Sequence, residues 1–181
     1  MNDYPRVIAA VRTTKDLEAA INAPTKAVFL LSGDIRTLEE HCNRLNQAKK
    51  QVFLHLDLVE GLKGDAAGIA FAAERFRING IISTKTTCLK HAKEAGLIAI
   101  LRVFIIDSSA LKTGIQLAKN CKPDWVEILP GVAPKIIKRA TAEFNLPIIA
   151  GGLIQERQDV EEAIAAGATA VSTSRRELWT P

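Results

Sequence analysis

The stretch Pro147-Ile148-Ile149-Ala150-Gly151-Gly152-Leu153-Ile154 joins a short apolar run to two glycines. Its residues 148–150 predict a buried strand, because the run is short, continuous and rich in β-branched residues. Gly151 and Gly152 lack a Cβ atom, so an anion can approach their main-chain N–H groups closely. About twenty residues further on, Ala170-Val171-Ser172-Thr173-Ser174 repeats this arrangement with hydroxyl side chains. We therefore predict two strand-to-helix turns that together bind one phosphate.

Three consecutive hydroxyl residues, Ser172, Thr173 and Ser174, close the second turn. Ser174 and Glu177 have the S-x-x-E spacing of a capping box, which predicts a helix start here. The unpaired N–H groups and partial positive charge of a helix N-terminus favour phosphate. In a (β/α)8 barrel, the loops after the last two strands are a frequent phosphate site. The alternative is two ordinary strand-to-helix turns, which also use glycine and capping residues.

Short apolar runs alternate with amphipathic segments along the whole chain. The apolar runs cover residues 7–11, 27–31, 52–57, 80–83, 97–103, 125–128, 148–150 and 170–172. The helical patterns cover 14–22, 37–48, 65–76, 87–95, 109–120, 133–144, 159–166 and a stub at 174–179. This alternation predicts parallel strands with right-handed crossovers. We expect one α/β domain over residues 1–181, a compact (β/α)8 TIM-type barrel with short helices. The alternative is an open doubly wound sheet; closure is favoured because it leaves no exposed edge strand.

Two further signals predict where helices begin and end. Thr37 and Glu40 have capping-box spacing at the start of the second helical pattern. Asn79-Gly80 is typical of a left-handed helix end and closes the third pattern.

The composition sets limits on the class of protein. The chain has 181 residues, a net charge of +4 and a pI of about 9.1. This mildly basic balance permits nucleic acid or phosphorylated ligands as partners but identifies neither. Met1 is followed by polar residues rather than by a secretory leader, and no apolar run is long enough to cross a membrane. Three widely spaced cysteines form neither a disulfide framework nor a metal motif. We expect a cytoplasmic protein with no membrane partner and no metal or other cofactor.

Charged residues are predicted to gather at the carboxyl ends of the strands. In the third run, Val52, Leu54 and Leu56 share one parity and should face the helices, so that His55 and Asp57 point inward. The same reasoning places four charged side chains near one rim, where barrels bind ligands. These side chains are Asp57, Lys85, Arg102 and Glu127, and Arg12 and Ser32 end the first two strands. The alternative is a salt-bridge network in which the four charges neutralise one another.

A cluster of cations lies on the sixth helical pattern. Lys135, Lys138 and Arg139 are three and four residues apart and so share one face of a helix. Most such clusters are simply a solvated surface. The alternative is contact with a nucleic-acid backbone.

Several long motifs resemble one known family. They are His55-Leu56-Asp57-Leu58-Val59-Glu60-Gly61-Leu62, Gly80-Ile81-Ile82-Ser83-Thr84-Lys85, Pro123-Asp124-Trp125-Val126-Glu127-Ile128-Leu129-Pro130-Gly131, the two turns quoted above, and Leu178-Trp179. Over nearly its whole length the chain resembles the glycerol-3-phosphate-responsive antiterminators, which regulate bacterial glycerol-uptake operons. Gly64-Asp65 and Asn79 depart from the family pattern in minor ways.

The resemblance implies a phosphate-binding (β/α)8 barrel that is not an enzyme. It implies that glycerol 3-phosphate is the effector and that leader mRNA of glycerol-metabolism operons is the partner. Phosphate contacts are implied for Gly151, Gly152, Ser172, Thr173 and Ser174. Contacts to the rest of the ligand are implied for Asp57, Glu60, Lys85, Arg102 and Glu127.

Two alternatives remain open at the level of sequence. A sugar-phosphate isomerase or aldolase could use Asp57 or Glu127 to move protons and Lys85 to form a Schiff base. A ligand sensor could instead act on a protein partner. The sequence also leaves homo-oligomerisation open.

Overall fold

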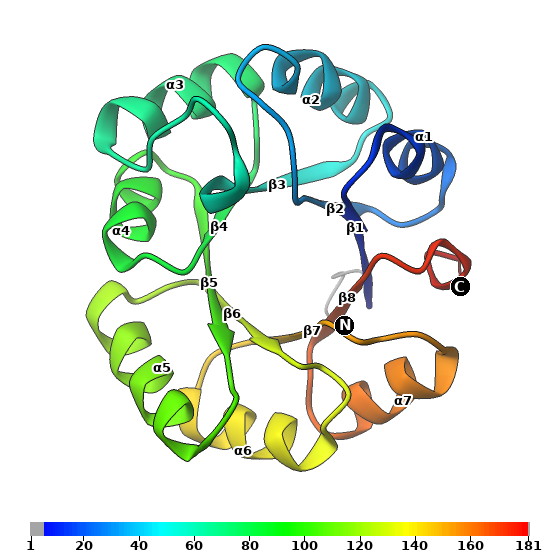
Figure 1. Ribbon diagram of the computed structural model, residues 1–181, viewed down its shortest axis with the longest axis vertical. Coiled ribbons are helices and arrows are strands. Elements are labelled where there is room, and N and C mark those ends of the chain that lie inside the picture. Colours follow the sequence, from blue (N-terminus) through cyan, green and yellow to red (C-terminus); the bar gives the residue numbers. More distant parts are fainter. Residues whose placement is uncertain (1–5, 181) are drawn as a thin grey trace.

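The computed structural model describes residues 6–180 and forms a closed eight-stranded barrel inside a ring of helices (Figure 1). The strands are β1 (Val7–Val11), β2 (Ala27–Leu30), β3 (Gln51–His55), β4 (Gly80–Ser83), β5 (Ile98–Phe104), β6 (Trp125–Leu129), β7 (Ile148–Gly151) and β8 (Ala170–Thr173). The α-helices are α1 (Thr14–Asn22), α2 (Leu38–Gln47), α3 (Ala66–Phe76), α4 (Thr86–Glu94), α5 (Ser108–Cys121), α6 (Pro134–Phe144) and α7 (Arg157–Ala165). Two short 3-10 helices are η1 (Leu56–Leu58) and η2 (Arg176–Leu178).

All neighbouring strands pair in parallel, and β1 closes the barrel against β8 through the partners Val7 and Val171. The predicted (β/α)8 barrel is therefore confirmed, and the open doubly wound sheet is wrong. Because every strand is parallel, all carboxyl ends meet at one end of the barrel and all amino ends meet at the other.

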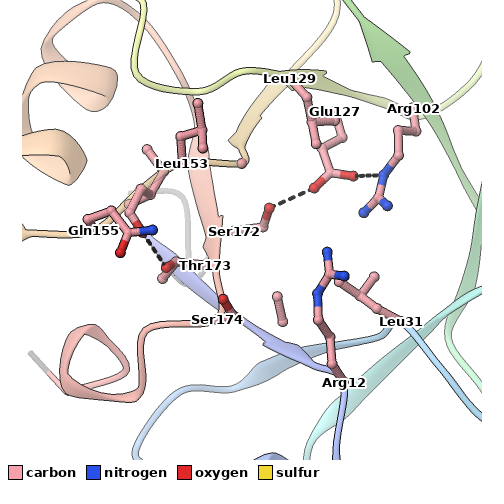
Figure 2. A pocket seen from close by; sticks show the side chains of 13 residues that line it. Arg12, Leu31, Arg102, Glu127, Leu129, Leu153, Gln155, Ser172, Thr173 and Ser174 are labelled. Atoms are coloured by element: carbon pink, nitrogen blue, oxygen red, sulfur yellow. Dashed lines mark hydrogen bonds and ion pairs between the residues drawn. The ribbon is translucent and has the colours of Figure 1, made fainter.

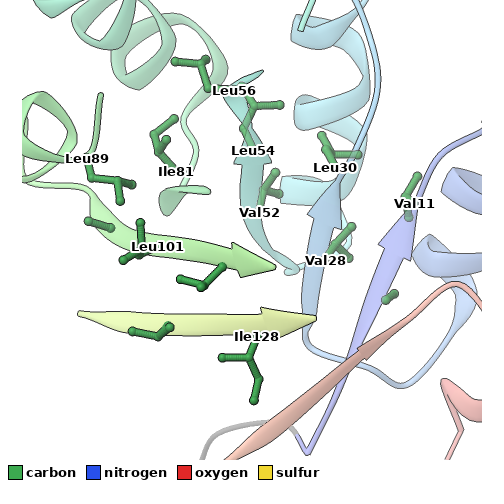
Figure 3. Packing of buried hydrophobic residues seen from close by; sticks show 14 of the residues in the cluster. Val11, Val28, Leu30, Val52, Leu54, Leu56, Ile81, Leu89, Leu101 and Ile128 are labelled. Carbon is green, nitrogen blue, oxygen red and sulfur yellow. The ribbon is translucent and has the colours of Figure 1, made fainter. Parts of the chain in front are cut away.

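The alternation predicted for the third strand is confirmed for Val52, Phe53 and Leu54, but the strand ends at His55, so Asp57 is not part of it. Val52 and Leu54 belong to the large apolar layer between strands and helices, part of which Figure 3 shows. Phe53 belongs to the smaller cluster that fills the barrel, where its ring meets Phe29 edge to face at 5.7 Å. Asp57 lies beyond the strand end, in η1. A side chain's parity along a strand thus decides which of the two apolar clusters it joins.

Both predicted capping boxes are wrong. Thr37 precedes α2 in a helical conformation, and its hydroxyl donates to the Asp34 carbonyl instead of capping. Ser174 does not begin a helix, because only the 3-10 turn η2 follows, after Arg175. A capping box does form at α1, where Thr13 and Asp16 bond reciprocally.

The third helix ends at Phe76, as its pattern predicted, but Asn79-Gly80 does not form its cap. Its left-handed cap is Arg77, with φ of 51°. The side chain of Asn79 instead accepts a hydrogen bond from the Val52 N–H at 2.8 Å, which ties the start of β4 to β3.

No helix among residues 6–180 combines the length and the apolar character that crossing a bilayer would need.

Candidate ligand-binding site

A pocket of about 170 Å³ opens at the carboxyl ends of the strands, beside β1 and β5 to β8 (Figure 2). A water molecule occupies roughly 30 Å³ in the liquid. The pocket therefore has room for a small organic phosphate. Its lining consists of Ala10, Arg12, Leu31, Arg102, Glu127, Leu129, Gly152, Leu153, Ile154, Gln155, Ser172, Thr173 and Ser174.

Glu127 organises one wall of this pocket. Its Oε2 accepts from Arg102 Nε and its Oε1 accepts from Ser172 Oγ, both at 2.6 Å. The pairing of β5 with β6 makes Arg102 and Glu127 direct neighbours, and both are buried, at 7% and 1% exposure. A buried charge needs a partner, so this ion pair fixes the orientation of the guanidinium. Arg102 Nε is thereby committed to Glu127, while the two terminal nitrogens make no ion pair or hydrogen bond within residues 6–180.

A second guanidinium comes from Arg12, which directly follows β1. Figure 2 shows it extending toward the guanidinium of Arg102 across the pocket. In the part of the chain that the structure describes, the Arg12 side chain has no carboxylate partner. Arg12 and Arg102 both line the pocket, and Glu127 is the one carboxylate among its described lining residues, so the pocket carries an excess of positive charge. Such a site attracts anions, and guanidinium groups suit phosphate oxygens in particular.

Asp16 fixes the main chain beside Arg12. Its Oδ2 accepts from the N–H groups of Arg12 and Thr13, and its Oδ1 accepts from the Arg176 guanidinium. Burial alone would raise the pKa of Asp16, but the hydrogen bonds from Arg176, Thr13 and Arg12 outweigh it and lower that pKa. The loop that carries Arg12 is thus tied to the segment after β8.

Main-chain donors come from the two turns that the sequence singled out. Gly152 and Leu153 both have left-handed backbones, with φ of 79° and 64°. Within residues 6–180, the N–H groups of Gly152, Leu153 and Ser174 donate to no protein acceptor. The left-handed conformation costs a leucine roughly 1–2 kcal/mol, and such strain is concentrated at ligand-binding positions.

Gly151 lies beneath the Glu127 wall and does not itself line the pocket. A Cβ atom there would lie 2.6 Å from both Glu127 Oε1 and Ser172 Oγ. The absence of a side chain at this position is what lets the Ser172–Glu127 hydrogen bond form.

Thr173 joins the two turns rather than facing the ligand space with a free hydroxyl. Its Oγ1 donates to the Ile154 carbonyl and accepts from the Arg175 N–H. Its carbonyl accepts from the indole of Trp179, which is buried. These contacts hold the β7 and β8 turns at a fixed separation.

A second polar cluster lies around Asp57, outside the pocket lining. The Asp57 carboxylate accepts from Ser83 Oγ, from the Thr84 N–H and from Thr84 Oγ1, at 2.7–2.9 Å. Burial alone would raise the pKa of Asp57, but these hydrogen bonds outweigh it and lower that pKa. Lys85 Nζ lies 3.8 Å from Asp57 and its side chain is 70% exposed.

The structure therefore divides the residues predicted for the site. It brings Arg102, Glu127, Gly152, Ser172, Thr173 and Ser174 together around the pocket. Asp57, Lys85 and Glu60 do not line it, and Glu60 forms a β-bridge with Asp34. The predicted alternative of mutual neutralisation is partly realised, since Asp57 pairs with Lys85 and Glu127 with Arg102. Arg12 and Gln155 line the pocket but were not among the predicted site residues. The sequence did place Arg12 at the end of the first strand, which was the signal for including it in the site.

His55 is a buried polar residue near this site. It is 3% exposed, and its Nδ1 has no hydrogen-bond partner among the residues that the structure describes. Burial first, and then the positive charge of Arg102, lower the pKa of His55 from 6.5 to about 4. Its imidazole is therefore neutral at neutral pH.

This pKa predicts a pH dependence of stability. Between pH 6.5 and about 4 the unfolded chain binds a proton at His55 that the folded protein does not bind. We expect this residue to lower the free energy of unfolding by roughly 3 kcal/mol as the pH falls through that range. Urea titrations at several pH values measure the effect, with His55→Phe as the non-titrating control. The same pH dependence in both proteins would contradict the prediction.

The predicted basic face of α6 is partly neutralised. Arg139 forms an ion pair with Glu143 one turn further along the helix. Lys135 and Lys138 line a groove between α6 and α7 that also contains Glu162.

The fold and the pocket together define a (β/α)8 barrel with a cationic pocket at the carboxyl ends of its strands. Residues 7–179 match the family model described as "Glycerol-3-phosphate responsive antiterminator", and the chain belongs to this family.

Three relatives are similar to nearly the whole chain, and two of them carry a matching description. The chain is 36% identical to the glycerol uptake operon antiterminator regulatory protein of Listeria monocytogenes, whose crystal structure matches with a TM-score of 0.92 over 99% of this chain and 96% of that one. A glycerol uptake operon antiterminator-related protein of Thermotoga maritima is 33% identical, with a TM-score of 0.85 over 97% and 98% of the two chains. The uncharacterized protein YgcP of Escherichia coli (strain K12) is 37% identical over 174 residues, which cover 96% of this chain and 91% of that protein.

More distant structures share the fold alone. A deoxyribose-phosphate aldolase of Aeropyrum pernix is 12% identical, with a TM-score of 0.70 over 95% of this chain and 86% of that one. At this level of identity the likeness shows the barrel fold alone.

Proposed function

We propose that this protein is a sensor of glycerol 3-phosphate that acts on leader mRNA of glycerol-metabolism operons. The observation that carries the proposal is the pocket in which two guanidinium groups and unpaired main-chain N–H groups meet. Both kinds of donor suit a phosphate dianion. The description of the family supports this choice of ligand and a regulatory role.

In this proposal the ligand lies between the β7 and β8 turns and the two arginines. The N–H groups of Gly152, Leu153 and Ser174 donate to the phosphate, and the guanidinium groups of Arg12 and Arg102 balance its charge. Glu127 and Ser172 face the polyol part, where carboxylate and hydroxyl oxygens can bond to alcohol groups. Asp57, Glu60 and Lys85 then shape the rim without touching the ligand.

The geometry favours sensing over Schiff-base chemistry. An aldolase of that type needs a lysine whose amine reaches the substrate carbonyl. Lys85 is 70% exposed, lies against Asp57 and stays outside the pocket. None of the described residues that line the pocket is a lysine. Borohydride reduction in the presence of triose phosphates should therefore leave the mass of Lys85 peptides unchanged, whereas an adduct there would favour an enzyme.

Ligand binding should stabilise the fold in a way that depends on the phosphate. At roughly a hundred times Kd, a ligand adds about 2.7 kcal/mol. In a protein of this size that corresponds to an increase in Tm of about 5–10 °C. We expect this shift with glycerol 3-phosphate and little or no shift with glycerol, measured by thermal unfolding.

Two variants test whether the Tm shift comes from ligand bound in the pocket. Arg12→Gln should lose most of the shift, while Lys85→Gln should respond like the parent protein because Lys85 lies outside the pocket. Equal shifts with both compounds, or loss of the shift only in the Lys85 variant, would count against the proposed site.

The action on RNA requires that ligand binding favour one of two states of the protein. The α6 face, with Lys135, Lys138 and Arg139, is the RNA-contacting surface that the sequence alone suggests.

A further inference from the structure

The charges of the loops are divided unevenly between the two ends of the barrel. The loops that follow the strands carry six cations and seven carboxylates. The segments that precede the strands, from Arg6 onward, carry six cations and one carboxylate. These six cations are Arg6, Lys26, Lys49, Lys50, Arg77 and Lys122, and the carboxylate is Asp124. The excess positive charge of the loops thus lies at the end opposite the pocket, here called the amino-end face.

Little on this face neutralises these cations. Asp124 is paired with Lys93 at 3.4 Å. Lys50 donates to the carbonyls of Ala23 and Thr25 and is partly buried. The other five are exposed, and none of them makes an ion pair with a described carboxylate. They are Arg6, Lys26, Lys49, Arg77 and Lys122.

Hydrogen bonds hold most of these positions next to one another. The Gln51 N–H donates to the Lys26 carbonyl at 2.7 Å, which brings the starts of β2 and β3 together. The Asn46 side chain at the end of α2 donates to the Arg77 carbonyl at the end of α3. Consecutive helices α1, α2 and α3 lie side by side around the barrel (Figure 1). The cations from Lys26 to Arg77 therefore form one continuous sector.

The backbone at three of these cations is unusual. Lys49, Arg77 and Lys122 are left-handed at the ends of helices, with φ of 57°, 51° and 46°. Glycine or asparagine is preferred there, and Asn145 occupies the equivalent place after α6 with φ of 51°. A cation near a helix C-terminus also stabilises the helix dipole, but a cation in the last helical turn does so without this backbone cost. Dipole compensation alone therefore does not account for cations at these three positions.

We propose that the amino-end face, rather than the α6 face, binds the RNA phosphate backbone. The proposal rests on the RNA action proposed above and assigns it to a surface. Exposed cations that have no carboxylate partner can contact phosphates and release counterions on binding. On α6, by contrast, Arg139 is already paired and Glu162 lies beside Lys135 and Lys138. Ligand and RNA then bind at opposite ends of the barrel, so that coupling between them passes along its strands.

The left-handed cations allow a test that leaves the fold intact. Asparagine tolerates this conformation better than lysine or arginine does, so the combined variant Lys49→Asn, Arg77→Asn, Lys122→Asn should be at least as stable as the parent. Fluorescence anisotropy measures its affinity for labelled RNA that carries a glycerol-operon leader sequence, over a range of salt concentrations and with glycerol 3-phosphate present. The matched control, Lys135→Gln, Lys138→Gln, Arg139→Gln, removes the same charge from α6.

Loss of three phosphate contacts makes the fall of log K with log salt concentration less steep, by about 2 units of slope. At roughly 0.1 M salt this corresponds to about a hundredfold loss of RNA affinity. We expect this loss in the asparagine variant and less than about a threefold change in the α6 variant. Unchanged binding in the asparagine variant, or equal losses in both, would overturn the assignment. If the parent protein binds no RNA at any salt concentration but binds vesicles of anionic phospholipid, both this assignment and the proposed action on RNA are wrong. In every case the ligand-induced Tm shift tests the pocket separately.

Discussion

Glu127→Ala is expected to lower the free energy of unfolding by about 3–5 kcal/mol. The substitution removes the carboxylate that pairs with Arg102. The Arg102 side chain, which is only 7% exposed, is then a buried charge without a partner. It also takes away the acceptor for Ser172 Oγ. A buried charge without its partner is among the few causes of destabilisation this large.

Equilibrium urea unfolding measures this change. Glu127→Gln is the matched control, because its side-chain oxygen can still accept one hydrogen bond at nearly unchanged volume. We expect its cost to fall between those of the parent and the alanine variant. If the free energies of unfolding of the alanine variant and the parent differ by less than about 0.5 kcal/mol, the ion pair with Glu127 does not fix the Arg102 guanidinium.

Gly151→Ala is expected to weaken glycerol 3-phosphate binding by about tenfold to a hundredfold. The added methyl group would lie 2.6 Å from both Glu127 Oε1 and Ser172 Oγ, so these side chains must move apart. Arg102 then loses its orientation, and a charge-assisted hydrogen bond to the ligand is worth about 1.5–3 kcal/mol. Overpacking should cost a further 1–3 kcal/mol or so of stability.

Gly96→Ala is the control for glycine substitution in general. Gly96 has a left-handed φ of 76°, but no atom lies within 4 Å of a Cβ added there. We expect a modest loss of stability with unchanged ligand affinity. Calorimetric titration of both variants decides the matter, and equal ligand affinity in the two would contradict a role for Gly151 beneath the Glu127 wall.

Much of the fold could be predicted because parity and spacing are local properties of the chain. The alternation in 52–57 placed Val52 and Leu54 outside and Phe53 inside, and the structure agrees. The helix boundaries were predicted to within one or two residues, but the capping residues were not, because capping depends on which acceptor lies nearest. Thr37 bonds to Asp34, and the cap of α3 is an arginine rather than the expected asparagine.

The site could be predicted in part for a related reason. Arg102 and Glu127 meet because they are paired residues of the neighbouring strands β5 and β6. Ser172 reaches Glu127 from β8, across Gly151 of β7. Asp57 follows its strand in a 3-10 turn, and that turn directs its carboxylate to the loop after β4. Neither the turn nor the separation of the two polar clusters has a signature in the sequence. The orientation of Arg12 across the pocket likewise depends on the whole barrel.

The crystal structure of this protein with glycerol 3-phosphate tests the central claim most directly. We expect phosphate density between the β7 and β8 turns, within hydrogen-bond distance of the Gly152 and Ser174 N–H groups and of the Arg12 and Arg102 guanidinium groups. Density for the phosphate beside Asp57 and Lys85, with the pocket filled only by water, would contradict it.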